Sequence, residues 1–189
     1  MSLMESLYKG PVIPSVRSIE DFNLALSDTT APSLFLLFGD INNLPKLLRL
    51  AEQHKKRLLV HGDLLEGVGK DKAGIKYLAR QGVTALVTTK PHLVKMAREE
   101  GLVVIQRLFL IDSEALRTGI KLLREHKPDA VEILPASVPR AAVQEIVRGA
   151  SLPVFAGGLV TSREDVLQAL KAGACAVSTS KRELWNIRV

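Results

Sequence analysis

Two segments near the carboxyl end of the chain carry residue types suited to binding phosphate. Residues 153–159 form an apolar run that contains a glycine pair at 157–158, and residues 176–180 form a second run that ends in three hydroxyl side chains. Glycine lets a ligand approach backbone N–H groups closely, and the start of a helix attracts anions through its unpaired amides and its dipole. Because one helix-sized segment separates the two runs, both strand-to-helix junctions face the same way. We predict a phosphate site here, formed by Gly157, Gly158, Ser178, Thr179 and Ser180.

Short apolar runs alternate with amphipathic stretches of helical length along the whole chain. There are eight such runs, and they lack the alternation of a half-exposed strand, which is typical of parallel strands buried on both faces. The sequence therefore predicts an α/β fold, a (β/α)8 barrel of the TIM type, in which the loops after strands seven and eight form the usual phosphate site. The predicted strands are residues 11–16, 33–38, 57–61, 85–87, 103–105, 130–134, 153–156 and 176–178.

Helix boundaries are marked between these runs. Ser18, Asp112 and Ser162 are suitable N-caps because each precedes acidic residues. Glycine commonly ends a helix, and the predicted stops are Gly82, Gly101, Gly149 and Gly173.

The length of 189 residues makes this a compact barrel, since about 250 is usual. Consequently the loops must be short and the last helix truncated to a turn or two, which Trp185 packs onto the barrel wall. We expect a single domain over residues 1–189, with residues 1–3 a remnant of cloning.

Composition is that of a soluble globular protein, with 47% hydrophobic and 24% charged residues. No apolar run approaches the roughly 20 residues of a membrane helix and the start lacks a signal-peptide pattern, so we expect a cytoplasmic protein without membrane association. The net charge of +6 favours an anionic partner, either a small phosphate compound or nucleic acid. The single Cys175 excludes an intramolecular disulfide, and we expect it to be buried.

Polar residues follow the predicted strands at the end where a barrel has its mouth. Cations can hold a phosphate and carboxylates can accept hydrogen bonds from hydroxyls, so this set suits a hydroxylated, phosphorylated small molecule. The candidates are Asp40, His61, Asp63, Lys90, Arg107 and Glu132.

Each candidate also has a structural alternative. His61 titrates near neutrality and can transfer protons, or it can simply orient its neighbours. Asp40 and Asp63 can cap the helices that follow them. Lys90 can reach the mouth or pair with Glu132 or Asp63. Glu132 lies on an apolar strand and needs a partner, for which we expect Arg107.

Metal and cofactor motifs are absent from the sequence. The four histidines are scattered, and there is no HExxH pattern, cysteine pair, Walker loop or GxGxxG motif. We therefore predict no metal and no cofactor, and the sequence favours no particular oligomeric state.

Seven junction motifs fall in order along the chain. They are residues 38–41 (FGDI), 61–64 (HGDL), 88–90 (TTK), 105–109 (IQRLF) with Asp112 and Ser113, 132–135 (EILP), 156–159 (AGGL) and 177–180 (VSTS). From about residue 11 to residue 185, the chain closely resembles the glycerol uptake operon antiterminator regulatory proteins of Gram-positive bacteria.

The resemblance implies a barrel that senses glycerol 3-phosphate. When liganded, such a protein binds the leader of the mRNA for glycerol catabolism, so that transcription passes a terminator. The resemblance also places the phosphate on the glycine pair and on residues 178–180. Ser15, Gly62 and Thr88 depart from the family pattern, which affects only fine ligand preference.

An RNA surface would need exposed cations, because they bind phosphates. Aromatic residues make up only 4% of the chain, so few are available to stack on bases. The outer helices of any barrel also carry solvated Lys and Arg, and this explains each cluster equally well. The candidates are Lys55, Lys56 and Arg57 after the second helix and Lys72, Lys76 and Arg80 on the third, with further clusters at Lys46, Arg49, Lys70, Lys121, Arg124 and Lys127.

The alternative is an enzyme of the isomerase, aldolase or epimerase type that acts on a small phosphorylated substrate. His61, Asp40 or Asp63 would serve as the base and Lys90 as the electrophile or Schiff-base amine. Barrel folds host both classes, but the short loops leave little length for a closing lid. We therefore favour the regulator and assign no catalytic residue.

Overall fold

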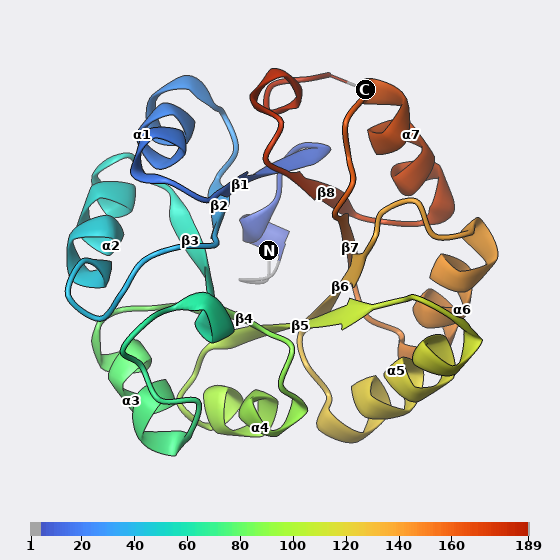
Figure 1. Cartoon of the computed structure of the whole chain (residues 1–189), viewed down its shortest axis with the longest axis horizontal. Coiled ribbons are helices and arrows are strands. Elements are labelled where there is room, and N and C mark those ends of the chain that lie inside the picture. Colours follow the sequence, from blue (N-terminus) through green and yellow to red (C-terminus); the bar gives the residue numbers. More distant parts are fainter. Residues whose placement is uncertain (1–4, 189) are drawn as a thin grey trace.

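The computed structural model describes residues 5–188 and forms a closed barrel of eight parallel strands. The strands pair in chain order from β1 to β8, and β8 closes on β1 (Figure 1). The barrel class predicted from the sequence is confirmed. The strands are β1 (Val12–Val16), β2 (Ser33–Leu36), β3 (Arg57–His61), β4 (Ala85–Thr88), β5 (Val103–Phe109), β6 (Ala130–Leu134), β7 (Val154–Gly157) and β8 (Ala176–Thr179).

Seven α-helices surround the barrel as an outer ring, one after each of the first seven strands (Figure 1). The hydroxyl or carboxylate of each predicted N-cap, Ser18, Asp112 and Ser162, accepts a backbone N–H in the first turn of its helix. The helices are α1 (Ile19–Asp28), α2 (Leu44–Gln53), α3 (Lys72–Arg80), α4 (Pro91–Glu99), α5 (Ser113–His126), α6 (Arg140–Ala150) and α7 (Arg163–Ala172).

Two predicted features of the chain are wrong. Gly149 does not stop α6, because that helix runs to Ala150 and Ser151 takes the left-handed conformation that ends it. Cys175 is exposed, because it lies in the turn before β8, outside the barrel wall. Residues 1–3, predicted to be a cloning remnant, lie outside the described residues.

Three short 3-10 segments complete the fold: η1 (Glu5–Leu7), η2 (Gly62–Leu64) and η3 (Arg182–Leu184). After β8 only η3 follows, and Trp185 is buried with its Nε1 donating to the Thr179 carbonyl at 2.9 Å. The truncated end and the packing of Trp185 are as predicted. No described helix is long and apolar enough to cross a membrane.

The amino end of the barrel is filled by apolar side chains. Leu7 is fully buried, and the ring of Tyr8 meets that of Phe155 edge-on with the centroids 5.4 Å apart. Phe35 and Ile105 fill the next part of the interior. Along the strands, such inward-facing residues alternate with outward-facing residues that pack under the helices. Polar side chains therefore enter the interior at the carboxyl end, where the candidate site lies.

Candidate functional site

A buried ion pair forms the centre of the barrel mouth. Arg107 on β5 and Glu132 on β6 are partners in register, and the Nε of Arg107 donates to Oε2 of Glu132 at 2.6 Å. Ser178 on β8 donates its hydroxyl to the other carboxylate oxygen, also at 2.6 Å. The side chains of Arg107 and Glu132 are only 8% and 1% exposed. The expectation that Glu132 pairs with Arg107 is confirmed.

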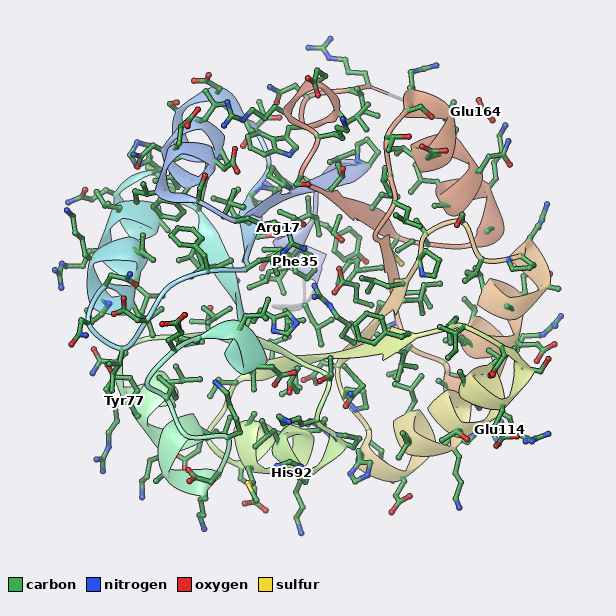
Figure 2. All side chains as sticks on the ribbon, in the orientation of Figure 1. Arg17, Phe35, Tyr77, His92, Glu114 and Glu164 are labelled. Carbon is green, nitrogen blue, oxygen red and sulfur yellow. The ribbon has the colours of Figure 1, made fainter. Side chains whose placement is uncertain are left out.

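A cavity of about 240 Å³ opens above this pair. The hydrogen bonds of Arg107 to the described residues engage its Nε and leave its two terminal nitrogens available to a ligand. Lys181 and Arg17 also line the cavity, and Arg17 lies near the barrel axis (Figure 2). The mouth thus offers an anion three cations against one carboxylate that is already paired.

Arg17 is a site residue that the sequence analysis missed. It follows β1 by one residue and continues the inward-facing series that includes Ile13 and Ser15. Because strand side chains alternate between faces, this period of two was the available signal.

The two predicted phosphate loops meet at this cavity. Gly158, Ser178, Thr179 and Ser180 line it. Gly157 lies beneath it, since an added Cβ would overlap the hydroxyl of Ser178 and lie 2.9 Å from a carboxylate oxygen of Glu132. Gly157 therefore makes room for the ion pair, while the other four face the cavity.

The loop after β7 has an unusual backbone. Gly158 and Leu159 both have positive φ, at 76° and 59°, and the Leu159 side chain is 79% exposed. A left-handed conformation costs a non-glycine residue about 1–2 kcal/mol, and here no burial of the side chain offsets it. The conformation turns this loop over the cavity, which Leu159 and Val160 also line.

The helix dipole predicted after residues 178–180 is wrong, and at the other junction a carboxylate already binds the N–H groups at the helix start. At the start of α7, the N–H groups of Thr161 and Ser162 are already bound to the carboxylate of Asp165, at 2.8 and 2.9 Å. After β8 the chain forms only the three residues of η3, too few aligned peptides for a macrodipole. An anion in the cavity must therefore rely on the cations, the hydroxyls and the loop amides before Thr161.

The two aspartates of the other half of the mouth bind the loops around them, and Asp40 binds its own. Asp40 accepts the N–H groups of Asn42 and Asn43 at 2.7 and 3.0 Å and the side-chain amide of Asn43 at 2.9 Å. Asp40 thus stabilises the turn that leads into α2, whose N-cap is Asn43.

Asp63 joins the loop after β3 to the loop after β4. Its carboxylate accepts the hydroxyl of Thr88 at 2.6 Å and both the hydroxyl and the N–H of Thr89, at 2.6 and 2.7 Å. Burial raises the pKa of the Asp63 carboxyl, but these hydrogen bonds outweigh it, so the pKa lies below its usual value. The alternative that Asp63 caps the next helix is wrong, because Asp71 caps α3.

His61 lies between the two halves, at the inward-facing end of β3, and is 4% exposed. Burial, with smaller contributions from the positive charges of Arg107 and Arg17, lowers the pKa of His61 to about 4, although Asp63 opposes the shift. The imidazole is therefore neutral at physiological pH, and its Nδ1 has no hydrogen-bond partner among the described residues. The ring of His61 can form a hydrogen bond with a ligand, but it contributes no positive charge to the site.

Lys90 pairs with neither Glu132 nor Asp63 in the described chain, so that alternative is wrong. It lies instead at the N-cap of α4. A lysine that the site prediction omitted, Lys70, donates its ammonium group to the carbonyls of Gly62 and Leu65. Burial and the nearby charge of Lys90 lower the pKa of Lys70, while Asp63 raises it. A lysine whose partners are backbone carbonyls has no signature in the sequence.

The basic residues predicted to contact RNA separate into two groups. Lys56 is buried, and its ammonium group donates to the carbonyls of Thr29 and Ala31 at 2.7 Å, so its assignment to an RNA surface is wrong. Lys70 also binds backbone carbonyls. The exposed candidates are Lys55, Arg57, Lys72, Lys76 and Arg80, together with Lys46, Arg49, Lys121, Arg124 and Lys127 of the further clusters. In the part of the chain that the structure describes, no cluster of three or more His, Cys, Asp or Glu residues is placed to hold a metal ion.

The fold and the site together define a class: a small (β/α)8 barrel whose mouth has a cavity lined by three cations. Residues 12–185 match the family model of the glycerol-3-phosphate responsive antiterminators. The chain belongs to this family.

Individual relatives agree with this assignment. The structure of a glycerol uptake operon antiterminator regulatory protein from Listeria monocytogenes superposes with a TM-score of 0.87 at 31% identity, covering 92% of this chain and 94% of that one. An antiterminator-related protein from Thermotoga maritima gives a TM-score of 0.84 at 29% identity, over 94% and 98% of the two chains. The uncharacterized protein YgcP of Escherichia coli strain K12 is 32% identical over 99% of this chain and 97% of its own length.

Proposed function

We propose that the mouth cavity binds glycerol 3-phosphate. The observation that carries the proposal is the buried pair of Arg107 and Glu132, which leaves the terminal nitrogens of the guanidinium to face a cavity that Arg17 and Lys181 also line. The phosphate would lie against these cations and the loops at Gly158 and Ser180, since charge-assisted hydrogen bonds to phosphate are strong. The size of the cavity, about 240 Å³, suits a small ligand.

The opposite side of the mouth would take the glycerol end of the ligand. His61 is buried, neutral and has a ring nitrogen without a described partner, so a ligand hydroxyl can bind to it. Asp40 and Asp63 remain part of the proposal as residues that fix the surrounding loops, because their oxygens are already engaged there, and Lys90 remains a proposed lining residue of the mouth.

The liganded protein would then act in the cytoplasm on the leader mRNA of glycerol catabolic genes and prevent termination of transcription. Support comes from the family, whose members are responsive antiterminators, and from the net charge of +6, which favours an RNA partner. Ligand binding would act by population shift: RNA must bind the liganded arrangement of the mouth loops more tightly than the free one.

The enzyme alternative has less support. Aldolases and an N-acetylmannosamine-6-phosphate epimerase superpose with TM-scores of 0.67 to 0.69, but at 11–15% identity they share only the fold. His61, the base candidate inside the mouth, faces two arginines, and no observation supplies it with a reacting partner.

Isothermal titration calorimetry with glycerol 3-phosphate tests the proposal, with glycerol and inorganic phosphate as comparison ligands. We expect saturable binding of glycerol 3-phosphate and recovery of the unchanged ligand. Gly158→Val should abolish binding, because the residue has positive φ and an added Cβ would lie 3.2 Å from the Leu134 side chain. Gly10→Val is the matched control, since a Cβ there meets nothing within 4 Å. Normal binding by Gly158→Val would reject the phosphate site, and a chemically altered ligand would restore the enzyme alternative.

A further inference from the structure

The outer face of α3 carries a run of positive charge that nothing within the helix balances. Lys72, Lys76 and Arg80 are all exposed and recur every four residues, so they lie along one side of the helix about 6 Å apart. Of the seven α-helices in the described chain, α3 alone has basic residues and no acidic one. None of its three cations forms an ion pair with a described residue.

Each of the other basic helices carries at least one carboxylate, and two of them form ion pairs. On α4, Lys95 lies 4.0 Å from Glu99 and Arg98 lies 3.7 Å from Asp129. On α5, Arg117 pairs with Glu114. Lysine and arginine on these helices therefore fit the ordinary solvated face of a barrel, whereas those on α3 require a different explanation.

The charge continues from α3 into a groove at its carboxyl end. A groove of about 570 Å³ lies between α2 and α3, and Arg80 lines it together with Arg49, Lys55 and Arg57. Glu52 is the one carboxylate in its described lining. With Lys72 and Lys76, these residues form a track of exposed cations that runs the length of α3 and into the groove.

The amino end of α3 is attached to the ligand mouth. Lys70 holds the carbonyl groups of the loop that carries Asp63, and Asp71 caps the helix by accepting the N–H of Gly74 at 2.9 Å. Gly74 packs so closely on Gly69 that an added Cβ would overlap the Gly69 carbonyl. Residues 62–71 and α3 therefore form one packed unit.

A second attachment joins α3 to the loop after β2. Tyr77, on the α2 side of α3 (Figure 2), donates its hydroxyl to the carbonyl of Ile41 at 3.0 Å. Ile41 in turn donates its N–H to Glu66 in the loop after β3, at 2.9 Å. A rearrangement of these mouth loops on ligand binding would consequently be transmitted to α3.

We propose that Lys72, Lys76 and Arg80, continued by Arg57 and Lys55 in the groove, form the surface that binds the phosphates of single-stranded RNA. This inference rests on the proposed antiterminator function and gives it a location. Contacts to phosphates position an RNA without reading its sequence, so the surface supplies affinity and register. Base recognition would come from neighbouring groups.

The experiment compares two double charge reversals that change the net charge equally. Lys72→Glu with Lys76→Glu alters the proposed surface, and Lys95→Glu with Lys121→Glu alters two exposed lysines on α4 and α5. The probe is a fluorescein-labelled single-stranded RNA of 20 nucleotides, titrated by anisotropy over a series of salt concentrations. Circular dichroism and calorimetry with glycerol 3-phosphate show whether each variant keeps its fold and its ligand site.

The α3 variant should bind the RNA at least tenfold more weakly at low salt. The slope of log K against log salt should fall by about 1.4, because each phosphate contact to a single strand contributes about 0.7. The α4 and α5 variant should keep most of its affinity and its slope. The neutral pair Lys72→Gln with Lys76→Gln should give a smaller loss in the same direction.

Several outcomes would overturn the inference. Equal losses in the two reversal variants would show a general charge effect, and no RNA binding by the unaltered protein would exclude an RNA surface altogether. If the α3 variant keeps its affinity for RNA but loses binding to phosphatidylserine vesicles, the track of cations binds a membrane instead. If the α3 variant alone loses RNA while no protein binds glycerol 3-phosphate, the RNA surface stands and the proposed ligand fails.

Discussion

The two halves of the barrel mouth use similar polar residues in opposite ways. In the half formed by β2 to β4, both carboxylate oxygens of Asp40 accept from donors in its own loop, and those of Asp63 accept from Thr88 and Thr89 at the end of β4. In the half formed by β5 to β8, the oxygens of Glu132 accept hydrogen bonds from Arg107 on β5 and Ser178 on β8, and the guanidinium still faces a cavity. The first half fixes loops, and the second presents a cation to a ligand.

The difference follows from where each carboxylate lies on its strand. Glu132 points inward from within β6, where water and loop donors are excluded, so only a charged partner offsets its burial. Asp40 and Asp63 come after their strands have ended, where backbone N–H groups are unpaired and readily bind a carboxylate. Position relative to the strand end therefore decides whether an acid supports the ligand site or the loop.

The largest test of this contrast is Glu132→Ala. The substitution leaves the Arg107 charge buried without its partner, which costs about 3–5 kcal/mol of stability. Urea unfolding followed by fluorescence of Trp185 measures the loss. Calorimetry should show that glycerol 3-phosphate no longer binds, because the guanidinium is no longer held in place.

Glu164→Ala is the matched control, since Glu164 is exposed on α7 (Figure 2) and should cost less than about 0.5 kcal/mol. A double variant, Arg107→Met with Glu132→Leu, removes both charges and should recover most of the stability without recovering ligand binding. Recovery of binding in the double variant would contradict the assignment of Arg107 as an anion ligand.

The next largest effect concerns His61, which lies between the two halves and faces Arg107, Arg17 and Asp63. Its pKa is about 4 in the folded protein against 6.5 for an unperturbed histidine. Between pH 4 and pH 6.5, His61 is therefore protonated in the unfolded chain but neutral in the folded one. The free energy of unfolding should therefore fall as the pH is lowered from 6.5 to 4, by on the order of 3 kcal/mol for this group.

His61→Gln should remove that component, so that the difference in stability between the protein and the variant shrinks or reverses toward pH 4. The measurement is a series of urea titrations between pH 7 and pH 4. His54→Gln provides the comparison, because His54 is an exposed histidine at the end of α2. Equal pH dependence in both variants would mean that burial and the two arginines do not lower the pKa of His61.

The barrel could be predicted because its strands are buried on both faces. Such strands appear in the sequence as apolar runs, and the eight runs coincide with β1 to β8. The prediction ended β5 four residues early, because Gln106 and Arg107 interrupt the apolar run while still pairing with Val131 and Glu132. Pairing with a neighbouring strand sustains a strand that its own residues do not mark.

The site was predictable only as far as the strand ends. Glu132 and Arg107 could be matched because a buried acid requires a cation. Lys56 and Lys70 could not be assigned, because their ammonium groups bind backbone carbonyls that become neighbours only in the fold. The lowered pKa of His61 likewise depends on its burial inside the barrel and, to a smaller extent, on Arg107 of β5 and on Arg17 after β1.

The smallest of the three effects, and the one that addresses the first half of the mouth, is Asp63→Asn. An amide in this position turns a donor toward the N–H and hydroxyl groups of Thr88 and Thr89, so we expect a loss of about 1.5–3 kcal/mol. The pKa of Asp63 is lowered in the folded protein, so its contribution is complete well above pH 3.8 and disappears as the pH falls below that value. The stability difference between the protein and the variant should therefore be constant at neutral pH and narrow in acid.

Ligand binding decides what Asp63 does in the mouth. If its oxygens only join the loops after β3 and β4, the folded Asp63→Asn protein should bind glycerol 3-phosphate with nearly unchanged affinity, in contrast to Glu132→Ala. If the Asp63→Asn protein is fully folded but binds glycerol 3-phosphate much more weakly, Asp63 contacts the ligand. The two halves of the mouth would then form a single binding surface. Because Asp63 lies in the loop held by Lys70, an affinity for RNA that no longer responds to glycerol 3-phosphate would instead identify this loop as the connection between the mouth and α3.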